Sequence, residues 1–148
     1  MKVVVQNKRA YYDYQIFEAL EAGIVLAGSE VKSIKMGRVS INESFARFRG
    51  GELFLFNAHI APYPAGVKAG YDPRALRKLL LKRQEIDRLV GRMKEGLTLL
   101  PLKVYIKYGI IKVEIAVARP KKKYDKREQL KKKMITREVE KTLGEWHL

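Results

Sequence analysis

Hydrophobic and polar residues alternate along much of the first 118 residues of this chain, a pattern typical of strands with one buried face. The alternation predicts strands over residues 12–17 and 23–26. Between them, residues 20–23 end in a glycine and are expected to form a turn. The beginning of the chain is therefore predicted to fold as two short strands.

Two hairpins are predicted further along. Residues 44–57 hold two alternating runs on either side of Gly50-Gly51, and such a pair readily adopts the positive φ angles of a two-residue turn. Residues 99–118 form a second hairpin around Tyr108-Gly109. In its second strand the charged residues alternate with apolar ones, so Lys112 is expected on the solvent side.

Two helices interrupt the strands. Ser29 is expected to cap a short helix that ends at Met36, before Gly37. A second helix is predicted over residues 82–94, because apolar residues recur there at positions i, i+3, i+4 and i+7. Short strands with tight turns and two helices predict a mainly β fold with accessory helices, namely an OB-like closed antiparallel β-barrel.

The segment over residues 61–73 is rich in proline, glycine and small residues, and it is expected to form a long exposed loop. Two tyrosines, Tyr63 and Tyr71, lie in it. These tyrosines have two alternative interpretations. Either they stack on nucleic-acid bases, or they hold the loop against the barrel.

The net charge of the chain indicates what kind of partner it binds. The 148 residues include 31 Lys+Arg and 16 Asp+Glu, which gives a formal net charge of +15. Residues 1–118 carry +9 and residues 119–148 carry +6, so the last fifth is much denser in charge. We expect a globular domain over 1–118 and a basic tail over 119–148 that is disordered or helical. Nucleic acid is the first partner to consider, and an anionic membrane the second.

Several kinds of chemistry find little support. The chain has no cysteine, which excludes disulfides and thiolate metal sites. Its imidazoles are His59 and His147, and His59 is expected to pack at the rim of the barrel. No phosphate-binding glycine loop, nucleophile elbow or paired-acid pattern occurs. We therefore expect no enzyme, cofactor or metal, and, without a signal or membrane-spanning segment, a soluble cytoplasmic protein.

Basic residues are concentrated before and within the second predicted helix. Such a run is usually a solvated surface, but beside the large overall excess of positive charge it favours a nucleic-acid interface. Recognition would then depend on RNA shape. The eight residues are Arg74, Arg77, Lys78, Lys82, Arg83, Arg88, Arg92 and Lys94.

Several stretches, in order along nearly the whole chain, resemble the small protein B family, the SsrA-binding proteins. They are Asn7-Lys8-Arg9-Ala10, Glu21-Ala22-Gly23-Ile24, Gly28-Ser29-Glu30-Val31-Lys32-Ser33, Ile60-Ala61-Pro62-Tyr63, Asp72-Pro73, Arg77-Lys78-Leu79-Leu80-Leu81, Pro101-Leu102-Lys103-Val104-Tyr105 and Tyr124-Asp125-Lys126-Arg127. The resemblance implies an OB-like barrel that binds transfer-messenger RNA (tmRNA, the SsrA RNA). It also implies delivery of tmRNA to ribosomes stalled without a stop codon, the process called trans-translation.

Site residues follow from the same resemblance. Glu21, Leu80 and Lys112 match positions that contact or shape the site for the tRNA-like part of tmRNA, and Lys82 stands where the family often has Asn or His. The expected tmRNA-binding set is Glu21, Leu80, Lys82, Lys112, Arg9, Arg77 and Lys78. Partners implied indirectly, through tmRNA, are alanyl-tRNA synthetase and elongation factor Tu.

The tail is the second functional part that the resemblance implies. It would enter the empty mRNA path and contact small-subunit rRNA in the decoding region. The expected ribosome-binding residues are Lys121, Lys122, Tyr124, Asp125, Lys126 and Arg127. The alternative is a structural rRNA-binding ribosomal or assembly protein, which would share the barrel, the charge and the tail. An RNA hydrolase and a membrane-binding role are less favoured.

Overall fold

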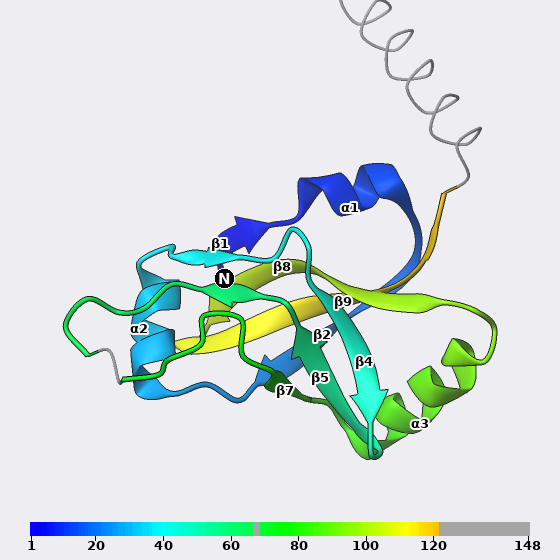
Figure 1. Ribbon diagram of the computed structural model, residues 1–148. Coiled ribbons are helices and arrows are strands. Elements are labelled where there is room, and N and C mark those ends of the chain that lie inside the picture. Colours follow the sequence, from blue (N-terminus) through cyan, green and yellow to red (C-terminus); the bar gives the residue numbers. More distant parts are fainter. Residues whose placement is uncertain (67–68, 122–148) are drawn as a thin grey trace, which may run out of the picture.

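The computed structural model describes residues 1–66 and 69–121, which form nine strands and three helices. Figure 1 shows the strands wrapped around one another, with the helices at their ends. The strands are β1 (Lys2–Gln6), β2 (Tyr14–Ile24), β3 (Val39–Ser40), β4 (Phe45–Arg49), β5 (Glu52–Phe56), β6 (His59–Ile60), β7 (Arg77–Leu80), β8 (Thr98–Lys107) and β9 (Ile110–Pro120). The helices are α1 (Lys8–Asp13), α2 (Gly28–Lys35) and α3 (Arg83–Met93).

Hydrogen bonds close six of these strands into a ring. The order runs β8, β4, β5, β7, β2 and β9, and β9 pairs with β8 to complete it. All of these pairings are antiparallel, and β1 continues the sheet along the free part of β8. The prediction of a mainly β fold with a closed antiparallel arrangement and accessory helices is therefore confirmed.

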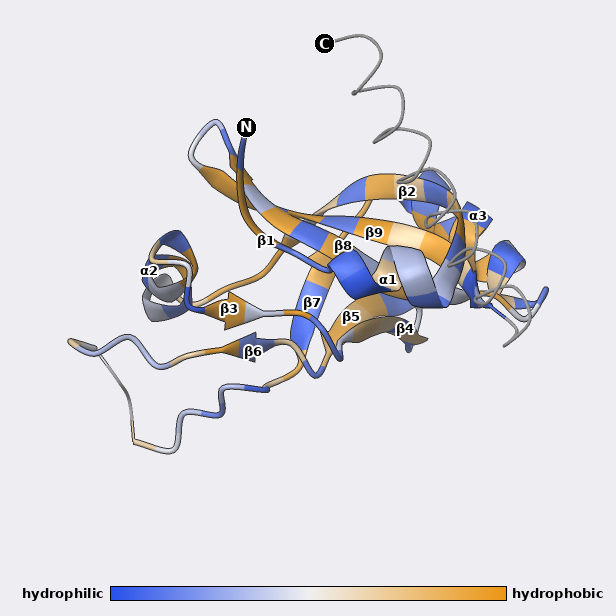
Figure 2. Cartoon of the chain, turned by 90° about the horizontal axis from the view of Figure 1, so that it is seen from above, coloured by the Kyte–Doolittle hydropathy of each residue, from blue (hydrophilic) through white to orange (hydrophobic). Residues whose placement is uncertain are grey.

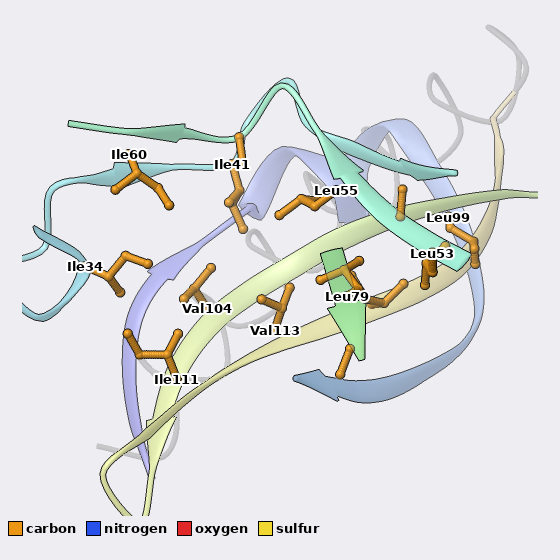
Figure 3. Packing of buried hydrophobic residues seen from close by; sticks show 14 of the residues in the cluster. Ile34, Ile41, Leu53, Leu55, Ile60, Leu79, Leu99, Val104, Ile111 and Val113 are labelled. Carbon is orange, nitrogen blue, oxygen red and sulfur yellow. The ribbon is translucent and has the colours of Figure 1, made fainter. Parts of the chain in front are cut away.

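The core lies inside the ring. Figure 3 shows side chains from opposite strands pointing toward one another there, among them Leu53, Leu79 and Val113. Each of these three side chains is at most 2% exposed. Full burial of such an aliphatic side chain contributes about 1.5–3 kcal/mol, so the inward positions of these strands supply the main stabilisation of the fold.

The strand β2 is longer than the sequence predicted. Residues 20–23 were predicted to turn, but β2 continues through them as one strand of 11 residues. β9 pairs with β2 from Tyr14↔Pro120 to Gly23↔Lys112 and so holds it extended along its whole length. The strand predicted over residues 12–17 also begins later, because residues 8–13 form α1, whose first turn is capped by the side chain of Asn7.

The two hairpins are confirmed. β4 and β5 meet around Gly50-Gly51, and β8 and β9 meet around Tyr108-Gly109. All four turn residues have positive φ angles, which is the backbone of the two-residue turns that match strand twist.

Helices α2 and α3 are confirmed with small shifts in their bounds. In α3 Leu89 is fully buried in the core, as the spacing of apolar residues predicts. Ser29 is not the cap of α2: the helix begins after Ala27, whose backbone N–H donates to the carboxylate of Glu30 at 2.9 Å. Figure 2 shows α2 and α3 at opposite ends of the ring.

Candidate nucleic-acid interface

A row of register partners crosses five neighbouring strands on the outside of the ring. Their order across the sheet is Leu80, Gly23, Lys112, Tyr105 and Val3. Side chains two residues apart on a strand share a face, so the adjacent outward positions of β2 and β8 are Glu21, Lys103 and Lys107. We call the surface formed by Glu21, Leu80, Lys103, Lys107 and Lys112 the sheet face. Residues far apart in sequence thus meet on one surface.

Leu80 owes its position to a glycine. It is 49% exposed, and its register partner on β2 is Gly23. A Cβ atom at position 23 would lie 3.3 Å from the Cβ of Leu80 and 3.6 Å from its Cδ1. Because Gly23 has no side chain, Leu80 can lie against the backbone of β2 while keeping half of its surface open to a partner.

Glu21 is held by two neighbours from β8. The hydroxyl of Tyr105 donates to Glu21 Oε1 at 2.5 Å, and Lys107 Nζ lies 3.5 Å from the same oxygen. The hydrogen bond from Tyr105 has the largest effect and lowers the pKa of Glu21; desolvation opposes it, and the charges of Lys107 and then Lys112 lower the pKa further. Glu21 therefore stays a carboxylate at neutral pH, fixed by a tyrosine that is itself 3% exposed.

Burial raises the pKa of Tyr105, and the bond to the Glu21 carboxylate raises it further, so its hydroxyl remains a donor. Lys103 completes this group, since its ammonium lies 5.9 Å from the centre of the Tyr105 ring and 3.6 Å from Glu114. Tyr105 is thus a buried support beneath the charged side chains of the sheet face.

Lys112 lies at the centre of the row. Within the described part of the chain it forms no salt bridge, whereas Lys103 and Lys107 each have a carboxylate within 4 Å. Its charge acts on Glu21, but no carboxylate of the described residues lies within 4 Å of its ammonium, so this outward lysine is suited to a phosphate group.

Two further predicted residues lie next to the sheet face. Lys78 precedes Leu80 by two positions on β7 and so points to the same side, where its ammonium lies 3.0 Å from Glu52 Oε1. Lys82 is exposed and forms the N-terminal boundary of α3. The structure therefore places Glu21, Leu80, Lys112 and Lys78 on one side of the sheet, and Lys82 follows Leu80 by two residues at the start of α3.

Arg77 points the other way, into the interior, and is 3% exposed. Its guanidinium lies 2.6 Å from the Glu30 carboxylate, and it donates to the carbonyls of Ala58 and Pro73 at 2.7 and 3.0 Å. These bonds tie β7 to α2 and to the loop after β6. Arg77 has no access to an RNA phosphate, so we leave it out of the sheet face and assign it a structural role.

The loop over residues 61–73 is fastened to this buried pair. Tyr71 donates its hydroxyl to the Ile60 carbonyl at 3.0 Å and accepts from Arg77 at 3.3 Å. Burial, followed by the Glu30 charge, raises the pKa of Tyr71. For Tyr71 the structure bears out the reading in which a tyrosine fastens the loop. Tyr63 lies beneath the ammonium of Lys32, 5.4 Å from its ring centre.

The predicted basic cluster is divided rather than continuous. Arg88 and Arg92 on α3 both reach the carboxylate of Glu18 on β2, at 2.5 and 2.9 Å. Arg83 lies 3.4 Å from Asp87. Glu18, which is 70 and 74 residues away from these arginines in sequence, thus offsets charges that the helical pattern alone assigns to an RNA-binding surface.

Arg9 and Lys121 lie at the other end of β2 from Glu21. Arg9, on α1, has an 82% exposed side chain and lies 3.3 Å from Asp13. The backbone N–H of Lys121 donates to the Asp13 carbonyl at 2.9 Å, and its ammonium donates to the Tyr11 carbonyl at 3.2 Å. The structure does not bring these two residues to the sheet face. The other predicted tail residues, Lys122, Tyr124, Asp125, Lys126 and Arg127, lie outside the described residues.

Comparison with known proteins assigns this chain to a family. A family model described as SmpB protein matches residues 4–145. This chain belongs to the SmpB family. Its relatives include SsrA-binding proteins of Geobacillus kaustophilus, 54% identical over 97% of this chain and 94% of the relative, and of Enterococcus faecalis, 50% identical over 96% and 93%.

A solved structure resembles the SmpB fold seen here. The matching chain comes from work described as "tmRNA-SmpB: a journey to the center of the bacterial ribosome". It is 50% identical, with a TM-score of 0.68, and the match covers 83% of this chain and 87% of that one.

Sequence reasoning missed the two residues that hold Glu21 in this candidate site, Tyr105 and Lys107, although a signal was present. A two-residue turn at Tyr108-Gly109 places Tyr105 directly opposite Lys112, and Lys107 lies on the same side as Tyr105. The register of the predicted hairpin was therefore sufficient to find both. Their bonds to Glu21 depend on how β2 pairs with β9, which the local pattern does not specify.

The described part of this SmpB chain lacks two features. No group of three or more His, Cys, Asp or Glu side chains is placed to hold a metal ion there. No helix in that part of the chain is long and apolar enough to cross a membrane.

Proposed function

We propose that this chain binds tmRNA and brings it to ribosomes stalled on mRNA that lacks a stop codon. The observation that carries the proposal is the match to SsrA-binding proteins over 97% of the chain, at 54% identity for the Geobacillus kaustophilus relative. A net charge of +15 supports it, because a polyanion is the partner that such a charge attracts.

The sheet face supplies three kinds of contact for a folded RNA. Lys112 is suited to a phosphate, and Leu80 offers an apolar surface to a base or ribose. The Glu21 carboxylate is fixed by Tyr105 and Lys107, and its second oxygen is suited to accept a hydrogen bond from a base amino group or a 2′-hydroxyl. Lys78 and Lys82 extend the positive charge at its edge. Such a surface recognises the shape of an RNA rather than a long sequence.

The tail is proposed as a second RNA-binding part. Residues 119–148 carry +6; the first two of them end β9, and the chain leaves the ring at its α1 end, where Lys121 is fastened. We place Lys122, Tyr124, Asp125, Lys126 and Arg127 against small-subunit rRNA in the decoding region. A basic segment that contacts rRNA gains affinity through release of counterions.

The proposed role is that of a binding factor, with no catalytic step and no cofactor. Alanyl-tRNA synthetase and elongation factor Tu would meet this chain through tmRNA rather than through a surface of their own. We place the protein in the cytoplasm, since that is where bacterial ribosomes work.

RNA binding is tested with a fragment of tmRNA that contains its acceptor arm and D-loop. The dissociation constant should rise by roughly 10³–10⁵-fold between 50 and 200 mM salt if six to ten phosphates are contacted. An unrelated RNA hairpin of equal length is the control. A flat salt response, or equal affinity for the control hairpin, would refute the proposal.

The role of the tail is tested by ending the chain after Lys121, which keeps the last described contacts with α1. We expect this shortened protein to bind the tmRNA fragment as the full chain does, and to lose tagging of stalled nascent chains. Continued tagging would remove the tail from the mechanism. Stable association with ribosomes in cells without tmRNA would instead favour a structural ribosomal protein.

A further inference from the structure

Tyr108 lies at the tip of the β8–β9 hairpin and is 93% exposed. Beside it, Ile110 is 57% exposed, and β1 pairs along the same hairpin through Lys2↔Ile106 and Val3↔Tyr105. Figure 2 shows this hairpin turn extending beyond the rest of the sheet near the N-terminus. A large aromatic side chain therefore stands almost wholly in solvent at the most projecting point of the sheet.

The backbone at Tyr108 is unfavourable for a tyrosine. Its φ angle is +52°, in the left-handed region, and Gly109 follows with +75°. Asparagine, aspartate and glycine are the residues that occupy this first turn position at little cost. The other hairpin of the ring meets the same requirement with Gly50 and Gly51, at +61° and +79°. Strain at an exposed position with no packing benefit points to a function for the side chain.

The tip adjoins the sheet face. Lys107, one of its residues, comes directly before Tyr108, and the Tyr105–Lys112 pair lies three register positions from the turn. At about 3.3 Å per residue, the tip is roughly 10 Å from that row, close to the spacing of one or two nucleotides. An RNA that places phosphates at Lys107 and Lys112 therefore passes within reach of the Tyr108 ring.

We propose that Tyr108 is an RNA-binding residue that stacks on an unpaired nucleobase of the RNA held by the sheet face. The inference rests on the proposed function and extends its site from the strands to the hairpin tip. Aromatic rings stack on bases of any sequence, so Tyr108 supplies affinity and position rather than sequence readout. The adjacent lysine charge is complementary to RNA.

The test is Tyr108→Asn, which removes the ring and relieves the backbone. We expect the melting temperature to stay equal or rise by about 2–4 °C, and the affinity for the tmRNA fragment to fall about fivefold or more. Because tyrosine is uncharged, the dependence of log Kd on log salt should keep its slope. Lys107→Gln should instead reduce that slope by about 1.

Two further variants sharpen the result. Tyr108→Trp keeps an aromatic surface and should bind within about twofold of the original chain. Tyr11→Ala removes another exposed tyrosine, at the α1 end of the ring, and should leave RNA affinity unchanged. Chemical probing of the bound RNA should show one unpaired nucleotide that loses protection in Tyr108→Asn and in neither control.

Equal RNA affinity of Tyr108→Asn and the original chain overturns this inference alone. The same holds if that variant keeps its RNA affinity but binds ribosomes less tightly, since the tip would then contact another partner. Failure of the original chain to bind the tmRNA fragment overturns the proposed function and this inference together.

Discussion

Leu80 on β7 lies against the backbone of Gly23 on β2, at a point where even a methyl group would come within 3.3 Å of its Cβ. The contact joins two strands that are distant in sequence, and it brings an apolar side chain beside the charged groups of the sheet face. The shape of that surface therefore depends on a residue that contributes no side chain to it.

Gly23→Ala should change RNA binding more than stability. Leu80 is half exposed and can move by the few tenths of an ångström that a new Cβ demands, so the free energy of unfolding should change by less than about 1 kcal/mol. The displaced Leu80 should weaken RNA binding about as much as Leu80→Ala does. Gly91→Ala on α3, where nothing lies within 4 Å, is the control. Unaltered RNA affinity in Gly23→Ala would count against Leu80 as a contact.

Lys112→Gln should weaken binding to every tmRNA fragment by a similar factor, because a phosphate contact carries no sequence information. The salt dependence of log Kd should become shallower by about 1. Arg49→Gln, which removes a charge from the exposed end of β4, should leave the slope unchanged. The measurement is a fluorescence-anisotropy titration at several salt concentrations, and an equal slope in both variants would exclude Lys112 from the interface.

Arg77→Met should destabilise the fold without altering the salt dependence of RNA binding. The variant leaves the Glu30 carboxylate buried without its partner, which costs about 3–5 kcal/mol. Replacing both partners, Arg77→Met with Glu30→Met, should be less harmful than either change alone, since no buried charge remains. Urea denaturation measures both. Arg74→Ala, at an exposed position, is the control, and a shallower salt slope in folded Arg77→Met would show that Arg77 contacts RNA after all.

Tyr105→Phe should raise the pKa of Glu21 toward its ordinary value of 4.5, because it removes the bond that does most to lower it. In the original chain the unfolded state binds a proton more readily than the folded state near this pH, so stability rises with pH. The contribution is present above pH 4.5 and is lost as the pH falls through the lower pKa of the folded state. The difference in melting temperature between the two proteins should therefore shrink in acid.

Nuclear magnetic resonance of the Glu21 side-chain carbonyl measures that pKa directly. The same variant should reduce RNA affinity at neutral pH, since the carboxylate loses its fixed orientation. Tyr11→Phe removes a hydroxyl at the α1 end and should leave both the Glu21 pKa and RNA binding as they were. A Glu21 pKa that does not respond to Tyr105→Phe would contradict the assignment of Tyr105 as its support.

Local pattern was enough for features whose partners are close in sequence. The glycine pair at 50–51 and the dipeptide at 108–109 located both hairpins, and the apolar spacing over 86–93 located α3. The turn expected before Gly23 was wrong because glycine has two uses: it permits a turn, and it permits close approach of a neighbour. Only the pairing of β2 with β7 and β9 shows that the second use applies.

The candidate site was predicted in part for the same reason. Glu21, Leu80 and Lys112 came from a family resemblance, and the structure places them on one surface. Arg77 belongs to the same basic run as Lys78, yet alternation along β7 sends the two side chains to opposite sides. A buried arginine is stable only with a buried partner, and that partner, Glu30, lies 47 residues away. The sequence around Arg77 and Lys78 therefore does not indicate that Glu30 is the partner of Arg77.

The attachment of Lys121 to α1 determines where the chain leaves the ring, and so how far that point lies from the sheet face. The sheet face lies near the end of β2 that holds Glu21 and Gly23, while the chain leaves the ring beside Asp13, just before β2 begins. The length of β2 therefore sets the distance between the sheet face and the point at which the chain leaves the ring. In the proposed function, a longer or shorter β2 would change the distance between the sheet face and the start of the tail without changing the residues of either.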